Sequence, residues 1–185
     1  MNQKELRIAL TGGGSGGHVY PLLAVAEALE QSAIEKKLSM KLRYFGPADS
    51  YTSILEHAGV KCNPIISGKV RRYVSLLNII DIPKFFIGLV QAFVKLFWFM
   101  PDAVFSKGGT GAFQVVFAAW CYRIPVIIHE SDAKPGLNNL LSARFAKRIA
   151  VSFECAKNYF NQKKTAWVCT PIRAALLGEK PSKEQ

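Results

Sequence analysis

The sequence predicts an α/β fold, in which a Rossmann-like parallel sheet carries helices on both of its faces. Short, solidly apolar segments alternate with stretches whose apolar residues recur at helical spacing. Strands that are apolar on both sides are typical of a parallel sheet covered by helices. Glycine-rich turns follow two of the apolar segments and lead into predicted helices. Of the 185 residues, 50% are hydrophobic, which suffices to bury the core of one domain.

The expected elements follow one another along the chain. Strands are predicted at residues 6–10, 42–46, 103–106, 126–129 and 149–151, with a third strand in chain order ending at residues 65–66. Apolar residues spaced i, i+3, i+4, i+7 predict a helix over residues 22–29, and Pro21 suits its first turn. Further helices are expected at residues 53–58, 112–122 and 137–145, and another after Pro83.

The segment Thr11–His18 joins the first strand to the first helix, and five of residues 12–17 are glycine. Glycine lets the backbone N–H groups approach a ligand closely, and a helix N-terminus favours an anion such as phosphate. His18 follows, with a side chain that titrates near neutrality and can exchange a proton. We therefore expect a phosphate-binding loop with a reactive neighbour. Its expected ligand-binding residues are Gly13, Gly14, Ser15, Gly16 and Gly17.

Three kinds of phosphate site compete for this loop. Gly12, Gly14 and Gly17 satisfy the dinucleotide pattern, but residues 44–47 at the end of the second strand contain no carboxylate for a ribose. A Walker loop needs a lysine where His18 stands. The remaining interpretation is a site for a diphosphate-sugar or a lipid diphosphate.

A second glycine loop, Ser106–Gly111, follows a later strand and precedes a helix. Lys107 would add a cation suited to phosphate, and Gly108, Gly109 and Thr110 would face the ligand. Both loops should open onto one edge of a parallel sheet, since ligands bind at the carboxyl ends of its strands.

The polar cluster His129–Asp132 follows the most apolar strand. Glu130 could bind sugar hydroxyls or assist proton transfer, and Ser131 and Asp132 would contact the ligand. The alternative is that Ser131 or Asp132 simply caps the next helix.

Composition restricts the partners. The net charge of +11 favours anionic partners, but no basic–aromatic motif points to nucleic acid. The four cysteines are widely separated, so neither a disulfide framework nor a zinc site is expected, and we predict no cofactor and no metal. The N-terminus lacks an apolar signal segment, so we expect a cytoplasmic protein.

An apolar segment with flanking cations lies in the middle of the chain. Its uninterrupted apolar run falls short of the roughly 20 residues that span a bilayer. Part of it should be a core helix, and part should form a monotopic membrane contact. The expected membrane patch consists of Lys69, Arg71, Arg72, Tyr73, Leu76, Leu77, Ile79 and Ile80.

Four motifs that occur in order along the chain give it a specific resemblance to a known family. They are residues 13–21, 67–72, 107–109 and 129–137, and together they resemble the N-terminal half of the MurG family. That family comprises UDP-N-acetylglucosamine:undecaprenyl-diphospho-muramoyl-pentapeptide N-acetylglucosaminyltransferases of peptidoglycan synthesis. The resemblance extends to residues 171–173, essentially the whole chain.

The resemblance implies one half of a GT-B type glycosyltransferase. Residues 1–173 would form the acceptor-binding domain, and residues 174–185 a polar tail that begins the link to a donor domain absent from this sequence. The activity implied is an inverting transfer of N-acetylglucosamine from UDP-GlcNAc to the undecaprenyl-diphosphate-linked acceptor, which converts lipid I to lipid II. His18 and Glu130 would be the catalytic polar groups. The enzyme would lie on the cytoplasmic face of the inner membrane as a peripheral protein, against anionic lipid, and this chain alone would be inactive.

Two other functions remain open. The chain could be a non-catalytic, membrane-recruiting subunit that binds lipid diphosphate and needs a separate donor-binding partner. A nucleotide-dependent oxidoreductase is the third hypothesis, and the missing ribose-binding carboxylate argues against it.

Overall fold

The computed structural model describes residues 5–68 and 77–173. Its strands are β1 (Leu6–Gly13), β2 (Met40–Gly46), β3 (Lys61–Pro64), β4 (Ala103–Gly109), β5 (Val126–Glu130), β6 (Arg148–Val151) and β7 (Thr165–Trp167). They form one sheet in the order β3-β2-β1-β4-β5-β6-β7, and every pairing is parallel. The predicted fold class is confirmed.

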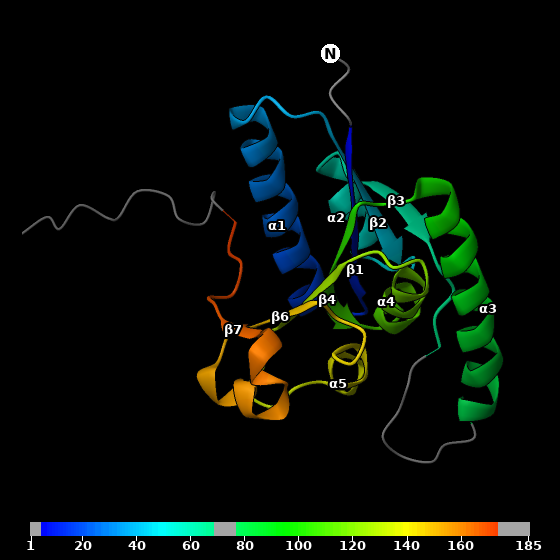
Figure 1. Cartoon of the computed structure of the whole chain (residues 1–185). Helices are drawn as coiled ribbons and strands as arrows, with labels where there is room; N and C mark the ends of the chain where they lie inside the picture. The colour runs from blue at the N-terminus through cyan, green and yellow to red at the C-terminus, as the bar shows by residue number, and fades with distance from the viewer. Residues whose placement is uncertain (1–4, 69–76, 174–185) are drawn as a thin grey trace, which may run out of the picture.

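Helices cover both faces of the sheet (Figure 1). On one face α1 (Gly16–Glu35) and α2 (Thr52–His57) pack on β1 and β2, around Leu10, Leu22 and Leu55. On the other face lie α3 (Leu77–Phe99) and α4 (Ala112–Cys121), whose core includes Leu96 and Val115. The remaining elements are α5 (Leu137–Ser142) and the 3-10 helices η1 (Glu154–Tyr159) and η2 (Gln162–Lys164).

The side of the sheet on which successive strands are added switches between β1 and β4. From β1 the chain moves outward to β2 and β3, then returns to β4 on the other side of β1 and continues to β7. In open parallel sheets such a switch point leaves a crevice at the carboxyl ends of the strands, where ligands bind. Both predicted glycine loops follow the two strands that flank this point.

Several predicted boundaries are wrong for local reasons. Pro21 lies inside α1, because Gly16 and Gly17 already adopt helical conformation ahead of it. The third strand ends at Pro64 rather than at residues 65–66, although the Ile65 N–H still bonds the Gly46 carbonyl oxygen at 2.7 Å. Helix α3 begins before Pro83 rather than after it. The edge strand β7 was not predicted, since its three residues are partly or fully exposed and form no apolar run.

Helix α3 buries one stripe and exposes another. Gly88, Ala92, Leu96 and Phe99 are buried, at spacings of four, four and three residues. Gly88 is required there, because a Cβ would overlap the carbonyl oxygen of Ile66. The opposite stripe is also apolar, and its members are 50–79% exposed: Ile82, Phe86, Ile87, Val90, Val94, Phe97 and Trp98. By length and composition residues Asp81–Phe99 could cross a membrane, with 22% of the segment buried.

Most residues of the predicted membrane patch lie outside the part of the chain that the structure describes. Residues 69–76, which include Lys69, Arg71, Arg72, Tyr73 and Leu76, lie outside the described residues. Leu77, Ile79 and Ile80 belong to the first turn of α3, without described side chains.

Candidate active site

The two glycine loops meet at the switch point. The Thr110 N–H donates a hydrogen bond of 3.2 Å to the Gly13 carbonyl oxygen. Gly14 and Gly109 have φ values of 86° and 84°, in the left-handed region that favours glycine. A Cβ on Gly109 would overlap the Gly13 carbonyl oxygen, and one on Gly14 would lie 2.6 Å from the Thr110 hydroxyl oxygen. The close approach of the loops therefore depends on these glycines.

The first loop presents the N-terminus of α1. Ser15 is the N-cap residue in extended conformation, its side chain makes no capping bond, and the first turn contains no acidic residue. The first N–H groups of a helix have no partner within it and attract an anion. Asp49 occupies only the adjacent Gly14 N–H, at 3.0 Å. The N–H groups of Gly16 and Gly17, at the first positions of α1, have no partner within the helix.

His18 lies on the first turn of α1, against the second loop. Its ring is so close to Gly109 that an added Cβ there would lie 2.6 Å from the imidazole Cδ2. Burial lowers the pKa of His18 below its usual 6.5, and the Lys107 charge lowers it further, while Glu130 and Asp132 partly oppose this. His18 is therefore neutral at pH 7 and able to accept a proton.

Lys107 lies beneath the loops rather than on their surface. It is 1% exposed, and its Nζ donates a 2.7 Å hydrogen bond to the Ser131 hydroxyl oxygen. Burial lowers the pKa of the Lys107 ammonium, whereas Glu130 and Asp132 favour its charged form. The predicted second and third polar clusters are thus joined by a direct bond between Lys107 and Ser131.

Glu130 is 3% exposed and organises the loop that follows β5. Its Oε1 accepts the Asp132 N–H at 2.9 Å, and its Oε2 accepts the Gly136 N–H and the Asn139 Nδ2, both at 3.0 Å. A carboxylate with three such partners holds residues 130–139 in one conformation.

Helix capping does not explain the polar cluster. The N-cap of α5 is Gly136, and no side chain caps it. The alternative role of Ser131 or Asp132 as the helix cap is therefore excluded. Asp132 instead lies at the edge of the cavity that this loop borders.

A cavity of about 280 Å³ brings the three clusters together. It is lined by His18, Gly109, Glu130, Asp132, Gly136, Leu137, Asn138 and Asn139. Four predicted site residues line it, and they come from all three clusters: His18, Gly109, Glu130 and Asp132. The other predicted site residues are not in its lining: Gly13, Gly14, Ser15, Gly16, Gly17, Lys107, Gly108, Thr110 and Ser131. Within residues 5–68 and 77–173, no group of three or more His, Cys, Asp or Glu side chains is arranged to hold a metal ion.

Four lining residues, Gly136, Leu137, Asn138 and Asn139, were not predicted as site residues, and the two asparagines make specific contacts. Asn138 Nδ2 donates to the Gly109 carbonyl oxygen at 2.6 Å, which ties α5 to the second loop. Asn139 is 4% exposed, and its Nδ2 bonds the His129 carbonyl oxygen as well as Glu130. Two adjacent asparagines at a helix start, just after a polar strand end, were the signal in the sequence.

His129 is excluded from the cavity lining. It is 2% exposed, and its Nε2 lies 3.3 Å from the Ser152 hydroxyl oxygen. Ser152 in turn accepts a 2.8 Å bond from the Thr170 hydroxyl. Burial, together with the Lys107 charge, lowers the pKa of His129 to about 4. This side chain holds β5 and β6 to the segment after β7.

A comparison with models of protein families shows to which family the chain belongs. Residues 8–151 match the model of the glycosyltransferase family 28 N-terminal domain. The chain belongs to this family. The predicted resemblance to MurG is also confirmed, because the chain is 40% identical over 172 residues to a Legionella pneumophila protein named UDP-N-acetylglucosamine–N-acetylmuramyl-(pentapeptide) pyrophosphoryl-undecaprenol N-acetylglucosamine transferase. A Treponema pallidum protein of the same name is 42% identical over 170 residues.

The matches cover most of this chain but only part of each relative. The two alignments cover 92% and 90% of the chain, and 46% and 43% of the relatives. The chain therefore spans about half the length of the curated relatives it matches.

Solved structures agree on the fold. MurG of Acinetobacter baumannii superposes with a TM-score of 0.73 at 23% identity, over 95% of this chain and 50% of that one. The UDP-GlcNAc 2-epimerase of Neisseria meningitidis gives a TM-score of 0.62 at 16% identity, over 94% and 49%. At these identities the likeness shows the fold alone, a Rossmann-like domain of the GT-B type.

Proposed function

We propose that the chain is the acceptor-binding half of an N-acetylglucosaminyltransferase that acts on undecaprenyl-diphospho-muramoyl-pentapeptide with UDP-GlcNAc as donor. The observation that carries this proposal is the contact between two glycine loops beside a cavity lined by His18, Glu130 and Asp132. Membership in glycosyltransferase family 28, and the printed function of the relatives, supply the substrate class. Transfer proceeds with inversion and without a metal held by the protein.

The acceptor diphosphate binds at the loops. The N–H groups of Gly16 and Gly17 at the start of α1 receive the anion, since those of Gly14, Gly108 and Thr110 are already bonded to Asp49, Ser106 and Gly13. Lys107 contributes positive potential from below, because its ammonium lies in a low-dielectric layer beneath the loops. Its role is electrostatic rather than a direct contact at the surface.

His18 faces the acceptor from the first turn of α1. Its neutral imidazole can accept a hydrogen bond from the ligand, and Glu130 acts through the loop that it holds. The Thr110 and Ser131 hydroxyls border the diphosphate from the second and third clusters.

Residues 1–173 form the acceptor domain, and residues 174–185 lead toward a donor domain. Arg173 is tied to α1 by a 2.7 Å ion pair with Glu27. The donor half would correspond to the remaining half of the relatives, so UDP-GlcNAc contacts come mainly from outside this chain.

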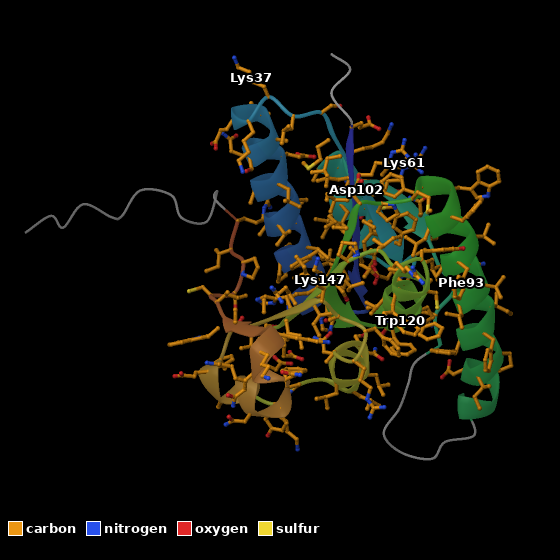
Figure 2. The ribbon with its side chains drawn as sticks, viewed as in Figure 1. Lys37, Lys61, Phe93, Asp102, Trp120 and Lys147 are labelled. Atoms are coloured by element: carbon orange, nitrogen blue, oxygen red, sulfur yellow. The ribbon has the colours of Figure 1, made fainter. Side chains whose placement is uncertain are left out.

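The membrane contact is proposed for the exposed stripe of α3 and the adjoining end of α4. Figure 2 shows Phe93 and Trp120 on these neighbouring helices, on the same side of the sheet. Trp120 is 50% exposed and lines a depression of about 420 Å³ with the cations Arg123, Arg144, Lys147 and Lys164. An apolar face beside a cationic groove suits the anionic cytoplasmic face of the inner membrane, with the protein bound peripherally.

A second candidate function is a non-catalytic subunit that recruits a separate donor-binding partner to the membrane. Both functions use the same acceptor site.

A transfer assay tests the proposal. The chain is mixed with lipid acceptor and UDP-GlcNAc, with and without a donor-half polypeptide of the family. We expect transfer only when the donor half is present, and a loss of about 100-fold or more in His18→Ala with its melting temperature retained. Transfer by the chain alone would refute the half-enzyme proposal, and wild-type rates in His18→Ala would remove the role of His18.

A further inference from the structure

Two carboxylates line the cavity, and they differ in burial and in hydrogen bonding. Glu130 is 3% exposed, and its two oxygens accept three N–H bonds at 2.9–3.0 Å. Asp132 is exposed at the cavity edge, and its carboxylate makes no hydrogen bond within the described part of the chain. The Asp132 backbone N–H is itself one of the three donors to Glu130, so Glu130 fixes where Asp132 stands.

The two carboxylates are therefore suited to different roles, Glu130 to holding its loop and Asp132 to contacting a ligand. A carboxylate offers about four lone-pair sites, and Glu130 uses three of them to hold its loop. Taking a substrate proton would compete with those bonds. Asp132 has all of its acceptor capacity available to a ligand, and it faces the cavity that His18 also lines.

The charge of Asp132 also limits what it can bind. A diphosphate beside the α1 N-terminus is anionic, and a second negative charge nearby would repel it. A sugar hydroxyl, in contrast, donates its hydrogen bond to a carboxylate and gains strength from the negative charge. Asp132 is therefore suited to the sugar of the acceptor rather than to its diphosphate.

Asn139, another residue of the cavity lining, has a side-chain oxygen without a hydrogen-bond partner among the described residues. Asn139 is 4% exposed, and the two partners of its Nδ2 are both acceptors, which defines the amide orientation. Its Oδ1 is buried without a hydrogen-bond partner among the described residues. This oxygen lies against Gly108, so Asn139 packs α5 against the second loop and leaves the carboxylate of Asp132 as the acceptor that is exposed to a ligand.

We propose that Asp132 is the catalytic carboxylate that accepts the hydrogen bond of the attacking acceptor hydroxyl and takes its proton. The inference rests on the proposed function and deepens it. The hydroxyl oxygen forms a bond to the anomeric carbon of the donor sugar as its proton moves to Asp132. The bond from that carbon to the diphosphate oxygen breaks, and the nucleoside diphosphate leaves with the electron pair. Glu130 is a positioning residue in this scheme.

The electrostatic surroundings are consistent with this assignment. Lys107 lies behind the cluster, where the charges of Glu130 and Asp132 favour its ammonium form against the effect of burial. His18 is neutral and adds no positive charge. Glu130, the third charged group facing the cavity, has its charge compensated by three N–H dipoles.

A binding experiment on the chain itself tests the sugar contact. Two probes are compared by calorimetry, a short-chain prenyl diphosphate and the same prenyl diphosphate carrying N-acetylmuramate. The variants are Asp132→Asn, which removes the charge at constant shape, and Glu30→Gln, a matched change on the exposed face of α1. We expect Asp132→Asn to bind the sugar-free probe at least as tightly as wild type, and to lose about tenfold of the preference for the sugar-bearing probe.

The outcomes separate the two proposals. Wild-type chain that binds neither probe would refute the acceptor site itself, and the inference with it. Binding of both probes with an unchanged preference in Asp132→Asn would overturn the sugar contact alone. With a donor half supplied, Asp132→Asn should lower kcat about 100-fold or more with little change in KM. A wild-type kcat in that variant would overturn the role of Asp132 as the base.

Discussion

The N–H of Thr110 bonds the carbonyl oxygen of Gly13 at 3.2 Å, and this contact makes two loops nearly 100 residues apart into one surface. Each loop alone is a common strand-to-helix turn. Beside their contact lies a cavity that is lined by Gly109 of the second loop, by His18 at the end of the first and by the loop after β5. The predictions below test the parts of this arrangement.

Replacing Gly109 by Ala should separate the two loops. The new Cβ would overlap the Gly13 carbonyl oxygen and crowd the His18 ring, at a φ of 84° that alanine disfavours. We expect about 1–3 kcal/mol of destabilisation and loss of prenyl diphosphate binding. Urea unfolding and calorimetry measure the two effects.

Gly59→Ala is the matched control for this change. Gly59 has nearly the same φ, 81°, but no atom lies within 4 Å of an added Cβ. It should show the backbone strain alone and keep prenyl diphosphate binding. Equal behaviour of the two variants would contradict the requirement for close loop contact.

Glu130→Gln should weaken the fold as well as the site. A Gln side chain presents an NH₂ group to at least one of the N–H donors that Glu130 now accepts, so a buried bond becomes a clash of donors. We expect a loss of about 1–3 kcal/mol in unfolding free energy, measured by urea denaturation. Glu30→Gln on the surface of α1 should leave the midpoint unchanged, and an unchanged midpoint in Glu130→Gln would contradict its role.

Stability should rise with pH between about 4 and 6.5. The pKa of His129 is about 4 in the folded protein, and close to 6.5 when the chain is unfolded. In that window the unfolded chain binds more protons, so unfolding free energy increases with pH and is fully gained above about 6.5. The lowered pKa of His18 acts in the same direction.

Urea unfolding from pH 4.5 to 7.5 measures this slope. His129→Gln should flatten the part of the slope that His129 contributes, with wild type and His18→Gln as references. An identical slope in His129→Gln and wild type would show that His129 titrates normally.

The α3 stripe should bind anionic vesicles. Val90 and Trp98 are 63% and 79% exposed, so replacing either by Glu leaves the core intact. We expect each change to weaken sedimentation with anionic vesicles about tenfold or more, since apolar contact is lost and a repulsive charge is gained. Ile34→Glu, at a 71% exposed site on α1, should have no effect. Equal binding by all variants, or none by wild type at low salt, would refute the membrane contact.

Much of the fold could be predicted because its signals are local. The glycines of both loops stand next to the strand and helix that they connect, and buried parallel strands are continuous apolar runs. The boundary errors arose where local preference was overridden. Gly16 and Gly17 are poor helix formers that nevertheless begin α1, and β7 gains its place only by pairing with β6.

The candidate site was predicted by residue type but not by role. His18, Glu130 and Asp132 were expected near one another, and all three line the cavity. Lys107 was expected at the ligand, but it is buried on Ser131. Asn139 was not selected: the pair of asparagines at the helix start marked the position, but only the fold shows that the Asn139 amide bonds both the His129 carbonyl oxygen and Glu130.

The sequence by itself determined the α/β class and the two glycine loops between strand and helix, because glycine conformation and helix ends act over a few neighbouring residues. Its membership in a transferase family followed from the resemblance of four motifs in order. Only the tertiary structure decided which polar atoms are already occupied. Gly14 meets Asp49 across 35 positions, and Lys107 meets Ser131 across 24. Parallel pairing of strands places these groups at one edge of the sheet, and their burial there decides which of them hold the protein together and which face a ligand.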